Sequence, residues 1–454
     1  MRCYYYRTHE RGGFYLPMAL LTGSSVPTQP RPLLVYIPGG PGQGYMTAAD
    51  HAQYWADWMD VNNVGFDLLL FDPRGSGESI PTAHCRKYHR RVRELLGEDI
   101  PLSEEYDQLN TILRRCFSDY HERLEAHLPD GDTGSLYDVL ATRQQALDID
   151  GMLAALGYTQ AHLWGVSYGT RYALLAAQSE RVSSLILDSP YPFSAGQYSD
   201  WLALYERSFD LFETLYARLP REKKPTDDFR TLFRTAQNQL TTAPLEVSVQ
   251  QWDSGRYQSL VLTPHRLLEL SFSVLYSPHL YKAYFSGLAY LANTGKPPEE
   301  WKPVLEDFYN NIVDKHFSFL SYFAVECLDN QKEAHDDVVE KLTRAPDIAD
   351  YFTTGLDFDI CRDVGFSETY SVQNSVYTDK PTLIFSGQYD PVTPAERGEG
   401  LSQQLNNARF FLLENTGHGS LQNQNCDWTF IDRFIASGDV NMSIPCKTLA
   451  PTWP

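Results

Sequence analysis

The first 192 residues alternate short apolar runs with amphipathic stretches. Leu33–Ile37 and Phe66–Phe71 are apolar runs that lead into glycine- and proline-rich turns, a pattern typical of strands buried on both faces. Leucines at near-helical spacing predict a helix over Tyr137–Leu156, which ends before Gly157. A strand, a helix and a second strand are then expected over 161–166, 170–178 and 184–188. Because this succession requires a parallel crossover, we expect an α/β fold with a mostly parallel central sheet and helices on both faces.

The pattern changes between residues 193 and 375, where amphipathic helical segments dominate. Helices are expected there over 200–219, 227–240 and 266–276. The strand pattern then resumes in two runs, at 382–386 and 409–414. We therefore expect one α/β core built from residues 1–192 and 376–454, with residues 193–375 inserted as a helical cap rather than as more sheet.

The segment 165–169 reads Gly-Val-Ser-Tyr-Gly and lies between a predicted strand and a predicted helix. A sharp strand-to-helix turn crowds the backbone around its central residue, and glycines tolerate that approach because they have no Cβ. Ser167 is thereby exposed at a helix N-terminus as a candidate nucleophile. A motif this short also occurs by chance in surface loops, but the strand before it and the helix after it favour the nucleophile.

A serine hydroxyl becomes a nucleophile when a histidine takes its proton and a carboxylate orients that histidine. In sheets of this class the partners follow in the order serine, acid, histidine, on loops after later strands. Asp390 follows the strand expected over 382–386, and His418 follows the strand expected over 409–414. Taken alone, an aspartate before proline is a common turn opener and a histidine between glycines is an ordinary loop residue. Together with Ser167, they predict a catalytic triad.

The same chemistry requires two backbone N–H donors for the oxyanion of the intermediate. One is expected from Tyr168, which follows the nucleophile. The other is expected from Gly40, in the Gly-Gly-Pro-Gly turn at 39–42 after an early strand, although such a turn also occurs without this role. In the next loop, Asp72 and Arg74 are expected to brace the structure rather than to take part in catalysis.

Charge and composition narrow the kind of partner. The 454 residues are 43% hydrophobic and carry a formal net charge of −20, which repels nucleic acids and anionic membrane surfaces. A cationic group on the substrate fits better, although the acidity also serves solubility alone. No apolar run reaches the roughly 18 residues of a membrane span. No HExxH or Cys/His cluster is present, so we expect neither a metal nor a cofactor. Among the other histidines, His84 and His89 are expected to be solvated.

The spacing of the seven cysteines permits three loops closed by disulfides and leaves Cys3 over. These loops are 85–116, 327–361 and 426–446. Spacing alone does not determine connectivity, and seven reduced thiols in a cytosolic enzyme are the alternative. The first residues lack the apolar core of a signal peptide, which indicates the cytoplasm if the N-terminus is complete.

Two further motifs accompany the triad candidates: Pro-Gly-Gly-Pro-Gly at 38–42 and Asp-Pro-Arg-Gly-Ser-Gly at 72–77. With the serine motif, Asp390 and His418, they make the chain resemble the α/β-hydrolases of the proline iminopeptidase and tripeptidyl aminopeptidase group. The resemblance runs from about residue 14 to the C-terminus and is weakest through the expected cap. These aminopeptidases carry a histidine before Gly-Gly-Pro-Gly, and Pro38 departs from that signature.

The resemblance implies an α/β-hydrolase fold and a serine peptidase that releases residues from peptide N-termini through an acyl-enzyme. Acidic cap residues of this group hold the N-terminal ammonium of the substrate, and Glu326 and Asp329 are the candidates; surface acids on a cap helix are the alternative. The segment from Cys426 to Cys446 looks like the paired-cysteine tail of the tripeptidyl aminopeptidase branch. Members of that branch are exported, which favours disulfides and a periplasmic or secreted location.

Two other functions remain open at this point. A carboxylesterase acting on small esters uses identical machinery, and it differs in not requiring a free α-amino group on its substrate. A non-catalytic binding protein on a hydrolase fold typically lacks a triad member, whereas all three are present here. Epoxide hydrolases and dehalogenases carry aspartate where this chain has Ser167. The expected partner is a peptide or a small amide or ester substrate.

Overall fold

An eight-stranded sheet forms the centre of the computed structural model, in the order β1-β2-β4-β3-β5-β6-β9-β10. The strands are β1 (Arg2–Arg7), β2 (Tyr15–Leu21), β3 (Leu33–Ile37), β4 (Asp67–Phe71), β5 (Ala161–Val166), β6 (Val182–Asp188), β9 (Thr382–Gly387) and β10 (Ala408–Leu413). β1 pairs with β2, and β2 with β4, in antiparallel fashion, whereas all other neighbours are parallel. The expected mostly parallel α/β sheet is therefore confirmed.

The structure describes most of the chain. The described residues are 1–8, 13–22, 31–127, 136–196, 198–330, 340–341, 348, 351–352, 356–364, 366, 378–421 and 425–447.

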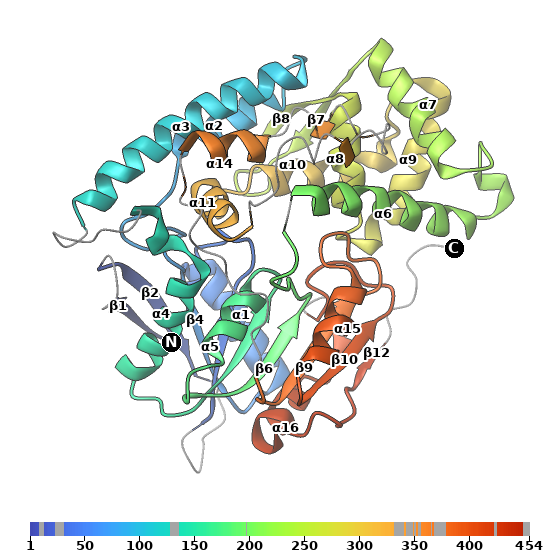
Figure 1. Ribbon diagram of the computed structural model, residues 1–454. Helices are drawn as coiled ribbons and strands as arrows, with labels where there is room; N and C mark the ends of the chain where they lie inside the picture. The colour runs from blue at the N-terminus through green and yellow to red at the C-terminus, as the bar shows by residue number, and fades with distance from the viewer. Residues whose placement is uncertain are drawn as a thin grey trace.

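Both faces of the sheet are covered by helices (Figure 1). The covering helices are α1 (Ala49–Asn62), α4 (Thr142–Ala155), α5 (Gly169–Ala176), α15 (Ala395–Gln404) and α16 (Thr429–Ser437). Because successive strand residues point to opposite faces, Val35 belongs to the apolar core that includes α4 and α5, whereas Leu34 belongs to the core that includes α1 and α16. Strands buried on both faces explain the unbroken apolar runs of the sequence.

A second layer of helices lies above one end of the sheet (Figure 1). It contains α6 (Tyr198–Ala217), α7 (Phe229–Thr242), α8 (Pro264–Val274), α9 (Tyr281–Thr294), α10 (Lys302–Ile312), α11 (Phe319–Asp329) and α14 (Leu356–Val364). The helices α6 to α10 share an apolar core of their own. Two earlier helices, α2 (Arg86–Leu95) and α3 (Leu102–Glu125), join this layer through contacts of α3 with α11 and α14. The division of the chain at residues 192 and 375 stays a prediction.

Two features of this region differ from expectation. The segment after α7 forms a hairpin of β7 (Leu245–Gln250) and β8 (Tyr257–Leu262), so the region is not purely helical. Its turn contains Gly255 at φ 64°, a conformation that favours glycine. The helix expected over 137–156 is divided at Ala141, whose ψ of 148° is extended. Part of the expected cap lies outside the described residues.

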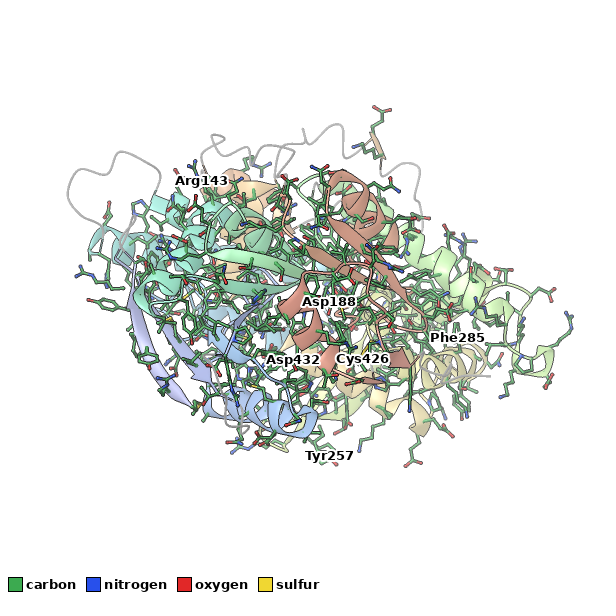
Figure 2. All side chains as sticks on the ribbon, turned by 90° about the horizontal axis from the view of Figure 1, so that it is seen from below. Arg143, Asp188, Tyr257, Phe285, Cys426 and Asp432 are labelled. Carbon is green, nitrogen blue, oxygen red and sulfur yellow. A yellow bond between two sulfur atoms is a disulfide. The ribbon has the colours of Figure 1, made fainter. Side chains whose placement is uncertain are left out.

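Short elements complete the described chain. The 3₁₀ turns are η1 (Leu136–Leu140), η2 (Arg221–Lys223), η3 (Pro278–Leu280) and η4 (Glu299–Trp301), and a two-residue ladder pairs β11 (Asn425–Cys426) with β12 (Cys446–Lys447). Figure 2 shows Tyr257, which is 60% exposed, at the rim of the molecule, and Asp188, which is fully buried, within it.

Three disulfides join the cysteines in the pairs that the spacing permits. They are Cys85–Cys116, Cys327–Cys361 and Cys426–Cys446. The remaining cysteine, Cys3, is exposed. Disulfides persist in oxidising compartments, so these three fit the periplasmic or secreted location expected above. Among the described residues, no helix is long and apolar enough to cross a membrane.

Candidate active site

Ser167 stands at the turn between β5 and α5, with a positive φ of 54°. Its N–H donates to the carbonyl oxygen of Asp188 at 2.9 Å, which fixes the turn against β6. A Cβ on Gly165 would lie 2.6 Å from the carbonyl oxygen of Gly169, and a Cβ on Gly169 would lie 2.4 Å from that of Ile37. Both glycines are therefore required by close packing of the turn, as expected for a nucleophile elbow.

His418 and Asp390 are in direct contact. The distance between His418 Nδ1 and Asp390 Oδ2 is 2.8 Å. The other carboxylate oxygen of Asp390 accepts the N–H groups of Val392 at 2.9 Å and Thr393 at 2.7 Å. The Thr393 hydroxyl donates to Asp390 Oδ2 at 2.7 Å, so four contacts hold a fully buried carboxylate in one orientation. This is the arrangement that fixes the tautomer of a catalytic histidine.

The electrostatics of the pair favour its charged form. Burial acts to raise the pKa of Asp390, but His418 and the hydrogen bonds from Thr393 outweigh it and hold the pKa below its usual value. Burial acts to lower the pKa of His418, yet the carboxylate of Asp390 raises it above the ordinary value. The imidazolium that forms when histidine takes a proton is thus stabilised in place.

A second buried carboxylate supports the loop that carries His418. Asp188, at the end of β6, accepts the Ser420 hydroxyl at 2.6 Å and the Leu421 N–H at 3.0 Å. Its neighbour Ser189 accepts the N–H groups of Gly419 at 3.0 Å and Ser420 at 3.3 Å. Burial raises the pKa of Asp188 to about 6. The histidine loop is therefore anchored to the strand next to the one that carries Ser167.

Ser167 and His418 line the same chamber, a cavity of about 360 Å³. Gly39 and Gly40 also line it, and a Cβ on Gly39 would lie 2.9 Å from the Cβ of Ser167. Gly40 has a φ of 110°, which only glycine adopts readily. Tyr168 is the N-cap of α5, where a backbone N–H has no partner within the helix. Both candidate oxyanion donors thus lie beside the serine.

The two candidate acids on α11 occupy different places. Glu326 is 6% exposed and lines the Ser167 chamber, and it accepts a hydrogen bond from Asn330 Nδ2 at 2.5 Å. Asp329 is 7% exposed and does not belong to the residues that line this chamber; it accepts the hydroxyls of Tyr168, at 2.7 Å, and Thr142. Neither is a surface acid, which rules out that alternative.

One guanidinium lies beside these acids. Arg171 is 1% exposed and donates to Asn330 Oδ1 at 2.7 Å and to the carbonyl oxygen of Ala195 at 2.7 Å. Its charge acts on both Glu326 and Asp329. The cluster formed by these three side chains therefore carries two carboxylates and one guanidinium, and Glu326 is the carboxylate that faces the chamber.

Residues outside the triad differ in how well sequence reasoning placed them. Asp72 accepts the N–H groups of Met46 and Glu78, and Arg74 pairs with Asp148 through two hydrogen bonds, so both brace the structure as expected.

The expectation that His89 is solvated was wrong. It is 8% exposed and stacks on His84, because α2 packs that face against the interior, and burial lowers its pKa to about 4.

Sequence reasoning missed several residues of the site. Thr393 lies three positions after Asp390, a spacing at which a hydroxyl and an N–H commonly bond an aspartate, so this signal was present. Asp188 carried no comparable signal. Tyr276, whose ring lies 5.2 Å from that of His418, comes from the region between β6 and β9 and had no local motif. No group of three or more candidate metal ligands occurs within the described part of the chain.

Comparison with known proteins identifies the family. Residues 32–421 match the family described as the alpha/beta hydrolase fold. The chain belongs to this family. The serine protease Hip1 of Mycobacterium tuberculosis is 23% identical over 444 residues, which cover 89% of this chain and 78% of that protein. The tripeptidyl aminopeptidase of Streptomyces lividans is 32% identical over 139 residues, or 30% of this chain and 24% of that protein.

A proline iminopeptidase from Mycobacterium smegmatis is among the similar solved structures. It covers 96% of this chain and 98% of its own, with 14% identity and a TM-score of 0.44. The matched family and the presence of a tripeptidyl aminopeptidase among the sequence relatives confirm the resemblance that the motifs indicate.

Proposed function

We propose that this protein is a serine peptidase that releases residues from the N-termini of peptides through an acyl-enzyme on Ser167. Two kinds of support combine. The relatives found by sequence include a serine protease and a tripeptidyl aminopeptidase. The observation that carries the N-terminal specificity is Glu326, a buried carboxylate in the chamber that also holds Ser167 and His418.

In the acylation step, His418 takes the proton of the Ser167 hydroxyl while the serine oxygen bonds to the scissile carbonyl carbon. The carbonyl oxygen becomes an oxyanion, which the N–H groups of Gly40 and Tyr168 stabilise. The intermediate then collapses: the C–N bond breaks, and the proton held by His418 passes to the departing amine. Asp390 stays ionised throughout and supports the imidazolium.

Deacylation repeats these roles with water. A water molecule gives a proton to His418 and its oxygen bonds to the acyl carbon. When the ester bond to Ser167 breaks, the serine oxygen recovers the proton and the peptide fragment leaves as a carboxylic acid.

Glu326 supplies the requirement for a free N-terminus. A buried carboxylate in the chamber pairs strongly with one ammonium group, and a blocked N-terminus offers it no positive charge. Substrates with a free α-amino group are therefore favoured over blocked ones. A carboxylesterase would use the same triad without this discrimination, so the α-amino requirement separates the two functions.

The test uses short peptidyl 4-nitroanilides in pairs that differ only in acetylation of the N-terminus. We expect hydrolysis of the free-amine member, no activity in Ser167→Ala, and an unchanged circular dichroism spectrum and melting temperature in that variant. Full activity of Ser167→Ala would overturn the assignment of Ser167 as the nucleophile. Equal turnover of blocked and free substrates would overturn the aminopeptidase assignment.

A further inference from the structure

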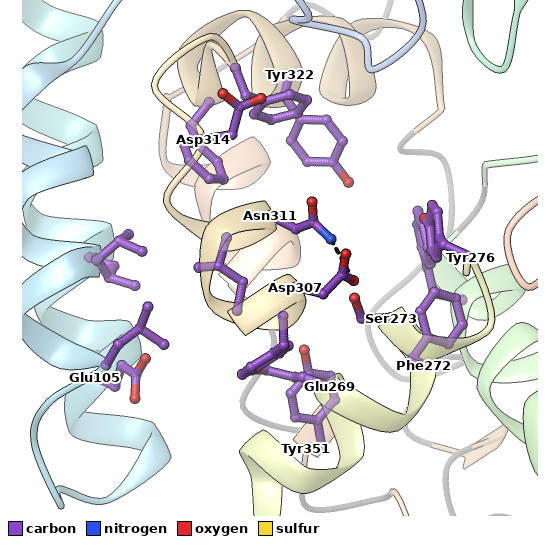
Figure 3. A pocket seen from close by; sticks show the side chains of 18 of the residues that line it. Glu105, Glu269, Phe272, Ser273, Tyr276, Asp307, Asn311, Asp314, Tyr322 and Tyr351 are labelled. Carbon is purple, nitrogen blue, oxygen red and sulfur yellow. Dashed lines mark hydrogen bonds between the residues drawn. The ribbon is translucent and has the colours of Figure 1, made fainter. Parts of the chain in front are cut away.

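Figure 3 shows a second and larger cavity, of about 820 Å³. It adjoins the Ser167 chamber. The two cavities share six lining residues: Gln43, Trp201, Tyr276, Phe317, Tyr322 and His418. They therefore meet at the candidate catalytic histidine. The proposed function assigns roles to the triad and to Glu326 in the smaller chamber, but it assigns no role to the larger cavity.

The floor of the large cavity is one face of α8 and the turn that follows it. Glu269, Phe272, Ser273 and Tyr276 line the cavity at positions i, i+3, i+4 and i+7, which fall on one side of a helix. The Tyr276 ring contacts that of His418, with ring centroids 5.2 Å apart. At about 1.5 Å per residue, Glu269 lies about 10 Å from Tyr276 along the line of α8 and the turn that follows it. An extended peptide covers that distance in about three residues.

Acids supply the charge of this cavity. Its lining residues include four carboxylates, Glu105, Glu269, Asp307 and Asp314, and no lysine or arginine among the residues that the structure describes. Two of these acids have cationic or basic neighbours. Arg266 Nη2 lies 2.9 Å from Glu105 Oε2, and His316 Nδ1 lies 3.6 Å from Asp314 Oδ1.

Glu269 and Asp307 are left facing the cavity. Asp307 accepts a hydrogen bond from Asn311 Nδ2 at 3.1 Å, and Glu269 has a hydrogen bond with Tyr351. 

The side chains that bond to these two acids, Asn311 and Tyr351, are neutral. Neither Glu269 nor Asp307 has an ion pair within the described residues. Burial raises the pKa of each carboxyl and outweighs the opposing charges of His265 and Arg266 at Glu269 and of His279 at Asp307. Figure 3 shows Asp307 on α10 reaching toward Ser273 on α8, with Glu269 one turn farther along α8.

Resting on the proposed function, we infer that this cavity binds the leaving-group side of the peptide and selects a lysine or arginine side chain at Glu269 and Asp307. The leaving amine takes its proton from His418, and His418 lies where the two cavities meet. The aromatic rings of Phe272 and Tyr276 suit the aliphatic stem of such a side chain, and its cation meets the two carboxylates. The spacing along α8 assigns this residue to about the third position beyond the scissile bond.

The test uses eight-residue peptides with a free N-terminus and one lysine or norleucine moved along the chain. Mass spectrometry of the products identifies the cleaved bond, from which each position is counted. With lysine at the third position after that bond, we expect kcat/KM about tenfold above the norleucine peptide. The double variant Glu269→Gln/Asp307→Asn should bring this ratio close to one. Asp314→Asn, the matched control in the same cavity, should keep the ratio.

Three results would overturn the inference: equal turnover of the lysine and norleucine peptides, a lysine preference on the acyl side of the bond, or a preference that survives in the double variant. Binding of both peptides to Ser167→Ala, measured by calorimetry, separates this inference from the proposed function. If the wild type cleaves no peptide, the proposed function fails, and tighter binding of the lysine peptide still supports the cavity's selectivity. Equal binding of the two peptides counts against that selectivity.

Discussion

The Ser420 hydroxyl donates a hydrogen bond of 2.6 Å to the fully buried carboxylate of Asp188. This bond joins the end of β6 to the loop that carries His418, across 232 positions of sequence. Asp188 also accepts the N–H of Leu421. The position of the candidate general base therefore depends on a carboxylate that does not itself belong to the triad.

Replacing Asp188 should weaken catalysis through the position of His418. In Asp188→Asn the amide makes weaker bonds to Ser420 and Leu421 than the carboxylate does, so we expect kcat to fall about tenfold with little change in KM. Steady-state kinetics on a free-amine peptidyl 4-nitroanilide measures this split. A rise in KM with unchanged kcat would contradict a positioning role.

The same variant has a defined effect on stability against pH. The folded-state pKa of Asp188 is about 6, above its ordinary value of about 3.9. The folded state therefore binds the proton more tightly, and the resulting stability is complete below pH 4 and lost as the pH rises through 6. Relative to Asp188→Asn, the wild type should lose roughly 2–3 kcal/mol of unfolding free energy across this window. Urea unfolding at several pH values tests this, and parallel pH curves for the two proteins would contradict it.

The contact between Asp390 and His418 should appear in the pH profile of activity. The base form of His418 is required, and because Asp390 raises its pKa, kcat/KM should rise with pH to a midpoint above 6.5. In Asp390→Asn the midpoint should fall, and kcat should drop by about 10⁴ because the tautomer is no longer fixed. Asp150→Asn, a partly exposed acid that pairs with Arg181, is the control and should leave the midpoint unchanged.

The two acids of α11 should separate in their effects. Glu326→Gln should raise KM for free-amine substrates about tenfold or more and leave acetylated ones unchanged, because it removes the counter-charge of the ammonium. Asp329→Asn should instead lower kcat and stability, since Asp329 accepts the hydroxyls of Tyr168 and Thr142. Its ratio of free to acetylated turnover should stay that of the wild type. If only Asp329→Asn loses the preference for free over acetylated substrates, Asp329 rather than Glu326 binds the ammonium.

A pair of glycine variants tests the packing of the elbow. Gly169→Ala places a Cβ 2.4 Å from the carbonyl oxygen of Ile37, so we expect a loss of several kcal/mol of unfolding free energy and of activity. Gly400 lies in α15 with no heavy atom within 4 Å of an added Cβ. Gly400→Ala should therefore stabilise the protein by about 0.5–1 kcal/mol, which chemical denaturation measures.

Much of the sheet follows from the sequence because its central strands, β3 to β6 and β9, are buried on both faces. Their apolar runs are unbroken and start and end within two residues of the expected positions, as at β3 and β5. The hairpin of β7 and β8 was not predicted because both strands are only six residues long and lie among helical segments, and only β7 alternates apolar and polar residues. The helix expected over 137–156 shows the opposite error, since apolar periodicity continues across the break at Ala141.

The sequence by itself determined the order of Ser167, Asp390 and His418 along the chain and their places after successive strands. It could do so because carboxyl ends of parallel strands meet at one edge, whatever else the fold contains. Tertiary structure alone decided which acid of α11 faces the serine. Glu326 and Asp329 lie on adjacent turns of one helix, and the docking of that helix points the first into the chamber and the second toward Tyr168.

Tertiary structure alone also decided that Asp188 anchors the histidine loop and that Glu269 and Asp307 line one cavity. Each pairing joins elements that are distant in sequence, and no local pattern encodes it. Such contacts arise only when the apolar cores bring the elements together, because burial of apolar surface fixes the positions of elements before individual polar partners are defined. Local sequence motifs therefore predicted the candidate catalytic residues, whereas the residues proposed for substrate selectivity could be assigned only from the packing of distant elements.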